Sequence, residues 1–139
     1  MIVHDFTHEN SILNQFISEL RDDSIQKDRM RFRTNIARVG EILSYELSKT
    51  LTYKDKKIHT PLGKKEMSLI QNQLVLCSVL RAGLPLHQGL LNYFDAADNA
   101  FISAYRHHRD NRDAFEVIVK YFAAPSLTNK TLILMDPML

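Results

Sequence analysis

Charged residues that follow three short apolar segments could bind a phosphorylated sugar. The segments and the residues after them are 74–80 with Arg81, 100–105 with Arg106, and 131–135 with Asp136. The planar guanidinium of an arginine can bind two phosphate oxygens at once. A carboxylate accepts hydrogen bonds from sugar hydroxyls or supports a bound Mg²⁺. Any one of the three could equally cap a strand where it emerges into water, but together they favour a binding site.

The first of these segments carries a second feature suited to phosphate. After Arg81 the chain continues Ala82-Gly83-Leu84-Pro85, where a flexible turn leads into an expected helix. The first N–H groups of a helix lack partners within the helix, and its dipole favours negative charge at that end. The turn is therefore expected to bind an anionic phosphate group.

The elements that position these residues are expected to form an α/β fold. The three apolar segments are typical of buried parallel strands, with a helix over 85–94 and a hairpin around 115–122 between them. This order predicts a doubly wound, mainly parallel sheet. Ligands of such sheets bind outside the carboxyl ends of the strands, so the three charged residues should lie at one edge.

The first part of the chain is expected to be helical and to lead into an arm. Helical spacing of apolar residues predicts helices over 9–21, with Asn10 or Ser11 as N-cap, and over 25–49. The segment 51–68, which contains Pro61 and Gly63, predicts a solvent-facing β-hairpin. We expect one domain: N-terminal helices over 1–50, an arm over 51–70 and the first part of an α/β core over 71–139.

Composition excludes several classes of protein. The 139 residues are 45% hydrophobic and 24% charged, as in folded globular domains. A net charge of +2 is too small for the dense basic face of a nucleic-acid binder. The single cysteine, Cys77, rules out a disulfide framework and is expected to be a buried thiol. The N-terminal residues 1–10 contain no apolar stretch long enough for a signal peptide or membrane span, so we expect a cytoplasmic protein without membrane partners.

Several other residues have two interpretations. His107 and His108 are expected in an exposed polar loop, although that loop could be a flap over a phosphate ligand. The pair His4 and His8 has a metal-like spacing without the rest of a metal motif, so no metal site is expected. The basic residues of the second helix should be solvated, though they could bind a nucleotide effector. Side chains that could line an interface, but are expected in the core, are Met30, Tyr45 and Tyr53.

Four stretches resemble the uracil phosphoribosyltransferase family in order and spacing. They are Arg31-Phe32-Arg33 followed by Gly40 to Glu46, then Val79-Leu80-Arg81-Ala82-Gly83-Leu84, then Tyr105-Arg106, and finally Leu134-Met135-Asp136-Pro137-Met138-Leu139. The resemblance extends over nearly the whole chain and implies a type I phosphoribosyltransferase fold. It also implies transfer of ribose 5-phosphate from phosphoribosyl pyrophosphate (PRPP) to N1 of uracil, giving UMP and pyrophosphate with Mg²⁺.

The resemblance assigns roles to individual residues. Arg81, Ala82 and Gly83 would bind the pyrophosphate of PRPP, and Arg106 would hold the same group. Asp136 would be the catalytic acid that opens the ribose 5-phosphate loop, where Pro137 replaces the second acid found in many phosphoribosyltransferases. Pro137, Met138 and Leu139 would begin that loop. No protein side chain is expected to bind a metal directly.

The resemblance also implies that the C-terminal part of the family's domain is missing from the given chain. The rest of the phosphate loop and the uracil-binding segment would follow Leu139, so we expect the chain alone to be inactive. A homodimer or higher homo-oligomer, and GTP as an allosteric activator, are further properties that the resemblance makes possible.

Two other classes of function remain as alternatives to the transferase. One is a non-catalytic regulator that keeps the phosphoribosyltransferase fold and senses pyrimidine nucleotides, which would need an RNA-binding basic face. The other is a piece that only associates with other chains, because a parallel sheet that lacks strands has an exposed edge.

Overall fold

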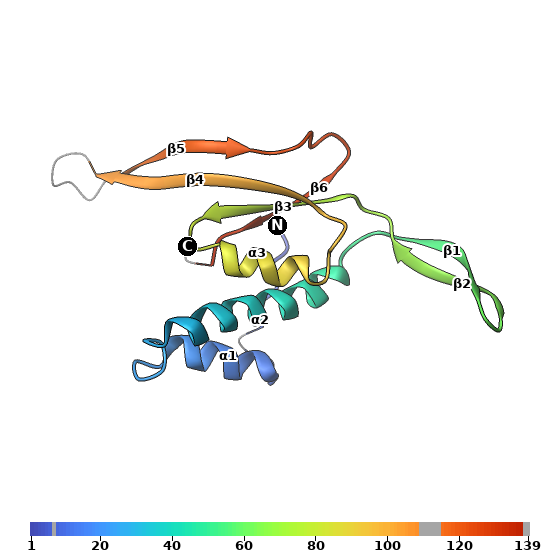
Figure 1. Cartoon of the computed structure of the whole chain (residues 1–139), viewed down its shortest axis with the longest axis horizontal. Helices are drawn as coiled ribbons and strands as arrows, with labels where there is room; N and C mark the ends of the chain where they lie inside the picture. The colour runs from blue at the N-terminus through green and yellow to red at the C-terminus, as the bar shows by residue number, and fades with distance from the viewer. Residues whose placement is uncertain (7, 109–114, 138–139) are drawn as a thin grey trace.

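The computed structural model describes residues 1–6, 8–108 and 115–137, and gives only the backbone for 106–108 and 115. The described strands form a four-stranded sheet and a two-stranded hairpin. Figure 1 shows the helices on one side of the larger sheet and the hairpin projecting from the body. The elements are α1 (Ile12–Arg21), α2 (Arg29–Ser48), β1 (Tyr53–Thr60), β2 (Gly63–Ile70), β3 (Leu74–Leu80), α3 (Leu84–Leu91), β4 (Asp98–His108), β5 (Phe115–Ala123) and β6 (Thr131–Met135).

The first two helices begin later than their apolar pattern predicts. The hydroxyl of Ser11 accepts a hydrogen bond from the amide of Leu13 (3.3 Å), which confirms Ser11 as the N-cap of α1. The carboxylate of Asp28 accepts from the amides of Met30 and Arg31, both at 3.0 Å, so α2 begins at Arg29. The prediction that this helix begins at 25 was wrong, because the cap at Asp28 and the turn over 23–27 determine its start.

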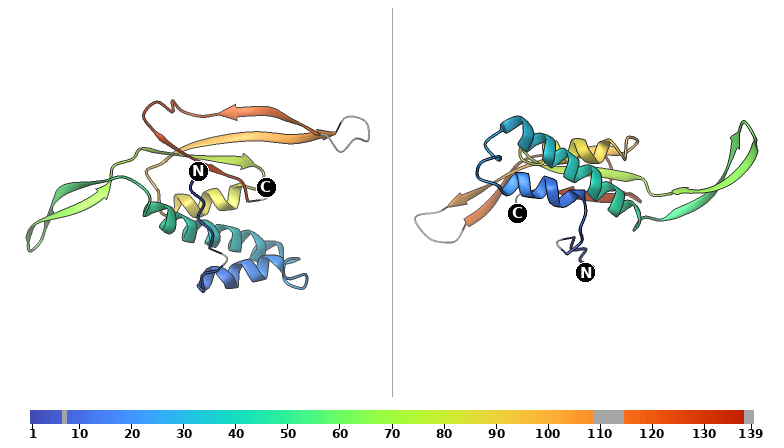
Figure 2. Two further views of the ribbon diagram at one scale, coloured as in Figure 1. Left: turned by 180° about the vertical axis from the view of Figure 1, so that it is seen from behind. Right: turned by 90° about the horizontal axis from the view of Figure 1, so that it is seen from below.

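Helix α2 packs against α3 by direct backbone contact. A Cβ atom added at Gly89 would collide with the carbonyl oxygen of Ala37, and one added at Gly40 would lie 2.7 Å from the carbonyl oxygen of Leu86. Figure 2 shows α2 lying along α3 when the protein is seen from behind. The two glycines therefore fix the position of α3, and with it the N-terminal end of that helix.

Helix α1 packs on the other side of α2 through polar groups. The fully buried Asn35 donates from Nδ2 to Oε2 of Glu19 (2.7 Å) and accepts at Oδ1 from Arg38 (3.1 Å). Glu19 also accepts from Gln15 (2.9 Å) and from Arg31 (3.2 Å). Hydrogen bonds from Gln15, Asn35 and Arg31 lower the pKa of Glu19 to about 2.

The sheet has the strand order β5-β4-β3-β6, which confirms a mixed α/β fold with parallel strands. Strand β3 pairs in parallel with β4 and with β6, and β4 pairs antiparallel with β5. The central strand is the most buried, and Cys77 within it is 1% exposed, as expected of a buried thiol. Burial raises the pKa of the Cys77 thiol. The apolar core between β3, β6 and α3 includes Leu74, Leu76, Leu86, Leu90, Phe94 and Met135.

Strand β4 is longer than the apolar segment that predicted it. It runs to His108 and pairs with β5 from Phe101 onwards, with Arg106 opposite Val117. The placement of His107 and His108 in an exposed loop was therefore wrong, as was the placement of Arg106 after the end of its strand. The antiparallel partner β5 supplies hydrogen bonds to these backbone groups, so the strand continues through polar residues.

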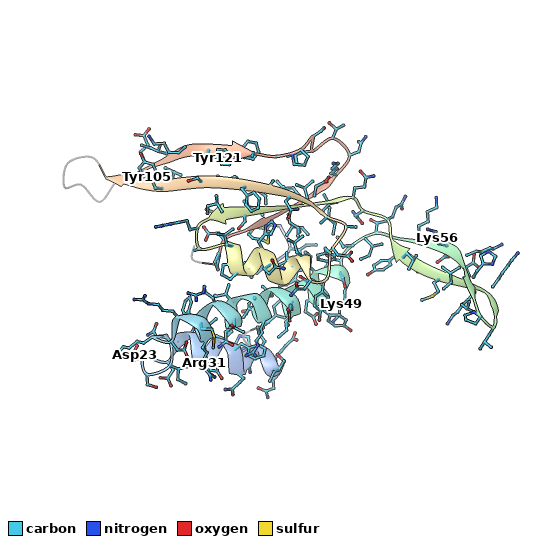
Figure 3. All side chains as sticks on the ribbon, viewed as in Figure 1. Asp23, Arg31, Lys49, Lys56, Tyr105 and Tyr121 are labelled. Carbon is cyan, nitrogen blue, oxygen red and sulfur yellow. The ribbon has the colours of Figure 1, made fainter. Side chains whose placement is uncertain are left out.

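Strands β1 and β2 form the predicted hairpin arm, paired from Tyr53 with Ile70 to Thr60 with Gly63. Figure 3 shows Lys56 on this arm, away from the helices and the sheet. The expectation that Met30, Tyr45 and Tyr53 are core residues was wrong, because they are 70%, 56% and 44% exposed. Among the described helices, none is both long and apolar enough to cross a membrane.

Candidate functional site at the carboxyl ends of the parallel strands

A short turn, 81–83, joins β3 to α3 and presents unpaired amides. Gly83 donates to the carbonyl of Val79 (3.0 Å), and Leu84 donates to that of Arg81 (3.2 Å). Within the described residues, no backbone carbonyl accepts a hydrogen bond from the amides of Arg81 and Ala82. Helix α3 then begins without a side-chain cap, and its second residue, Pro85, has no N–H group. The peptide bond between Leu80 and Arg81 is cis. The turn therefore offers N–H donors and an exposed arginine to an anion.

Gly83 allows this turn to lie directly on the ends of two strands. A Cβ atom at this position would collide with Oγ of Ser78, lie 2.7 Å from the carbonyl oxygen of Val79, and lie 3.3 Å from that of Met135. The first two belong to β3, and Met135 is the last residue of β6. A side chain at position 83 would push the turn away from both strands.

Asp136 lies next to this turn because β3 and β6 are parallel neighbours. Ser78 pairs with Met135, so Asp136 follows at the level of Val79, just before the turn. Asp136 is partly buried and interacts with other groups of the protein. The structure thus brings Arg81 and Asp136 to one edge of the sheet, as the sequence predicts. Pro137 follows Asp136, whereas Met138 and Leu139 lie outside the described residues.

Arg106 lies further along its strand than the other two residues. Leu80 at the end of β3 pairs with Ser103 of β4, and Arg106 is three residues beyond Ser103. At the usual rise of a strand this is a distance of about 10 Å along β4. The side chain of Arg106 is outside the described part of the structure.

Two buried polar side chains beneath the turn were not identified from the sequence. Ser78 is 0% exposed, and His87 on α3 is 4% exposed. Nε2 of His87 lies 2.6 Å from Oδ1 of Asn99, and the imidazole stacks on the ring of Phe101 at 5.0 Å between centroids. The signal that could have found Ser78 is a hydroxyl inside the apolar segment 74–80.

Among the clefts of the described structure, two border the sheet at different places. One of about 580 Å³ lies at the amino ends of the strands, where Lys130 and Asp98 form an ion pair at 2.5 Å. The other, of about 410 Å³, is mostly apolar and lies between α2, α3 and β6, with Asp136 among its lining residues. We assign the candidate site to the carboxyl end, because unpaired N–H donors and the exposed Arg81 lie there. The described residues hold no group of three or more acidic, histidine or cysteine side chains placed to bind a metal.

Comparison with known proteins identifies the family. The sequence model for uracil phosphoribosyltransferase matches residues 7–139. The chain belongs to the uracil phosphoribosyltransferase family. This confirms the resemblance based on the sequence around Arg81, Arg106 and Asp136.

Individual relatives agree with this family. The chain is 52% identical over 131 residues to uracil phosphoribosyltransferase of Porphyromonas gingivalis and 32% identical over 133 residues to that of Methanothermobacter thermautotrophicus. Each alignment covers 94% of this chain but only 60% of the relative. The chain therefore spans about 60% of the length of these curated relatives. Their names favour the transferase over a non-catalytic regulator.

A solved structure has the same fold. The AQ2163 protein of Aquifex aeolicus superposes with a TM-score of 0.81 at 26% identity, covering 100% of this chain and 63% of that one. The type I phosphoribosyltransferase fold expected of the uracil phosphoribosyltransferase family is thus consistent with the arrangement of helices and strands observed here.

Proposed function

We propose that this chain provides the PRPP-binding part of a uracil phosphoribosyltransferase, which makes UMP and pyrophosphate from uracil and PRPP. In this reaction the bond between ribose C1 and a pyrophosphate oxygen breaks, and a bond from C1 to N1 of uracil forms. N1 loses its proton, which the departing pyrophosphate can accept. The observation that carries the proposal is the turn 81–83, with its free amides and Arg81, which Gly83 allows to lie on the ends of β3 and β6, beside Asp136.

The turn would bind the pyrophosphate of PRPP. Its free N–H groups and the N-terminal end of α3 are directed donors, and they need little reorganisation as charge develops on the leaving group. The guanidinium of Arg81 would add charge-assisted hydrogen bonds. We assign Arg106 to the same pyrophosphate from the neighbouring strand, as the family resemblance implies.

Asp136 would act on the ribose. Its carboxylate can accept hydrogen bonds from the ribose hydroxyls and stabilise positive charge that develops at C1. One carboxylate beside a phosphate-binding turn also suits Mg²⁺, which proteins commonly hold through one or two carboxylates together with substrate phosphates and water. When bound, Mg²⁺ would neutralise charge on the phosphate oxygens. Pro137, Met138 and Leu139 would lead into the loop that holds the 5-phosphate.

Substitution of Arg81 tests the proposed site. Arg81→Ala should weaken binding of PRPP with Mg²⁺ about tenfold to a hundredfold, the usual range for lost charge-assisted hydrogen bonds, while the urea midpoint stays unchanged. Isothermal titration calorimetry gives the affinity. The matched control is Arg21→Ala, which removes an exposed arginine from the last turn of α1, away from the site. Equal affinity for PRPP in the Arg81 variant and the control would remove the assignment, as would a complete gene product that forms no UMP.

A homodimer formed through the arm is a further part of the proposal. The arm exposes apolar side chains, with Leu62 100% and Met67 40% exposed, and Tyr53 at its base is 44% exposed. An arm that projects from the body and carries such side chains suits an interface between copies. The double variant Leu62→Ser with Met67→Ser should be monomeric by light scattering where the wild type is dimeric. Met30→Ser, which changes an exposed methionine outside the arm, serves as control.

GTP as an activator would use the basic face of α2. Arg29 and Arg33 are both exposed on that helix. We expect GTP to raise the rate of UMP formation by the complete gene product, and the double variant Arg29→Ala with Arg33→Ala to lose that response while it keeps its basal rate. A wild type that does not respond to GTP would remove this part of the proposal.

A further inference from the structure

Two buried polar atoms beneath the turn 81–83 have no hydrogen-bond partner among the described residues. They are Oγ of Ser78 and Nδ1 of His87. Both side chains are at least nine-tenths buried, with exposures of 0% and 4%. An unpaired buried polar atom usually costs about 1–3 kcal/mol, so a folded protein rarely keeps one without a reason.

The two side chains lie in the same layer between α3 and the sheet. Ser78 pairs in register with Phe101 of β4, and the ring of Phe101 stacks on the imidazole of His87. On the side of the turn, Gly83 lies against Oγ of Ser78, and its carbonyl accepts the amide of His87 at 2.9 Å. Phe101 and Gly83 are therefore neighbours of both Ser78 and His87.

The two unpaired atoms are chemically complementary. Oδ1 of Asn99 can only accept, so Nε2 of His87 carries the proton and Nδ1 is left as an acceptor. The hydroxyl of Ser78 can rotate and donate. If the side-chain amide of Asn99 is flipped, its NH₂ group donates to Nε2 of His87, and Nδ1 then carries the proton. In that case Nδ1 would donate and Oγ of Ser78 would accept, so the two atoms remain complementary.

We propose that Ser78 and His87 are positioning residues for pyrophosphate, whose hydroxyl and Nδ1 form a hydrogen bond with each other when the turn binds its ligand. This proposal rests on the proposed function of the turn. A ligand held by the amides of Arg81 and Ala82 would shift the neighbouring Gly83. Gly83 lies against Oγ of Ser78, and its carbonyl accepts a hydrogen bond from the amide of His87. The new hydrogen bond joins β3 to the first turns of α3. It therefore holds the amides of the turn 81–83 in the position that they take when the ligand is bound.

Nitrogen NMR of the imidazole tests the pairing directly. In the ¹⁵N-labelled chain, addition of magnesium pyrophosphate should move the Nδ1 resonance of His87 towards that of a hydrogen-bonded nitrogen. In Ser78→Ala the same addition should leave it in place. The control is Ser44→Ala, another fully buried serine, whose hydroxyl is already bonded to the carbonyl of Gly40 at 2.7 Å. An Nδ1 resonance that stays constant in a wild type that binds pyrophosphate overturns the pairing and leaves the proposed function standing.

Affinities for magnesium pyrophosphate give a second, independent readout. Ser78→Ala and His87→Phe should each weaken binding about threefold to tenfold, as the loss of one hydrogen bond between neutral groups does. The double variant should be no weaker than the weaker single variant, because both changes remove the same bond. Ser44→Ala should keep the wild-type affinity even if it unfolds more easily. Losses that add in the double variant would overturn the pairing, whereas a wild type that binds no pyrophosphate would overturn the proposed function as well.

Discussion

The two interfaces of helix α2 are built in different ways. Against α3, Gly40 and Gly89 bring the two backbones into contact. Against α1, a carboxylate, a buried amide and two arginines share hydrogen bonds. Backbone contact leaves no room for adjustment, while exchangeable polar groups respond to solvent and pH. The rigid interface is the one that positions α3, whose first residues follow the proposed phosphate-binding turn.

The largest expected effect comes from a side chain added at the rigid interface. Gly89→Val would place atoms against the backbone of Ala37 and should destabilise the protein by about 1–3 kcal/mol or more, as overpacking does. Urea unfolding followed by circular dichroism measures this. Gln88→Val adds a branched side chain at the neighbouring exposed position and should cost less than about 1 kcal/mol. Similar losses in the two variants would show that the interface is looser than the backbone contact suggests.

Loss of the buried amide at the polar interface should have the next largest effect. Asn35→Ala removes the donor to Glu19 and the acceptor for Arg38, and should destabilise the protein by about 1–2 kcal/mol. Its unfolding midpoint is compared with that of Asn14→Ala, an exposed position on α1. If the two variants have the same unfolding midpoint, the polar network does not hold α1 in place.

The polar interface should also respond to acid, with a smaller effect. Because the pKa of Glu19 is lowered from 4.5 to about 2 in the folded protein, its stabilising effect is present above pH 4.5 and lost as the pH falls towards 2. Glu19→Gln should therefore reduce the loss of stability across this window. Hydrogen bonds from Ser24 lower the pKa of Asp22 too, but that contribution is the same in both proteins. Parallel curves of stability against pH for wild type and variant would contradict this role.

The smallest effect is expected from the exposed end of the same network. Arg31 donates to Glu19 at 3.2 Å, but its side chain is 51% exposed and solvent screens the pair. Arg31→Ala should shift the urea midpoint less than Asn35→Ala does, and high salt should remove the remaining difference. A shift as large as that of Asn35→Ala would place the main interaction at the arginine instead.

Some elements could be predicted to the residue and others could not, for physical reasons. The segments 74–80 and 131–135 agree with β3 and β6, because charged or turn-forming residues bound each of them. The start of α2 was missed because the apolar pattern begins at Ile25, before the capping residue Asp28. The end of β4 was missed because its pairing with β5 lies outside any local pattern.

The site was predicted in part. The meeting of Arg81 with Asp136 follows from parallel strands that end at one edge, and the sequence pattern was sufficient for that. Gly83 was expected for its flexibility, but its φ of −69° is open to any residue. The lack of space above Ser78 and Met135 is the actual requirement. The contact with Met135 joins elements that are distant along the chain, and the contact with Ser78 depends on how the turn folds back on β3, so no local pattern reveals them.

The strand order has a consequence for the way the chain folds. Strand β3 lies between β4 and β6, and β6 comes latest in the sequence among the strands that the structure describes. Strand β3 can pair with β6 only after the long segment between them has closed into a loop. During synthesis on the ribosome, Leu74–Leu80 would emerge well before 131–135. Until β6 is made, the unpaired edge of β3 could pair with strands of other chains. Rapid docking of α3 on β3, to which the short turn 81–83 joins it, would cover one face of the strand in that interval.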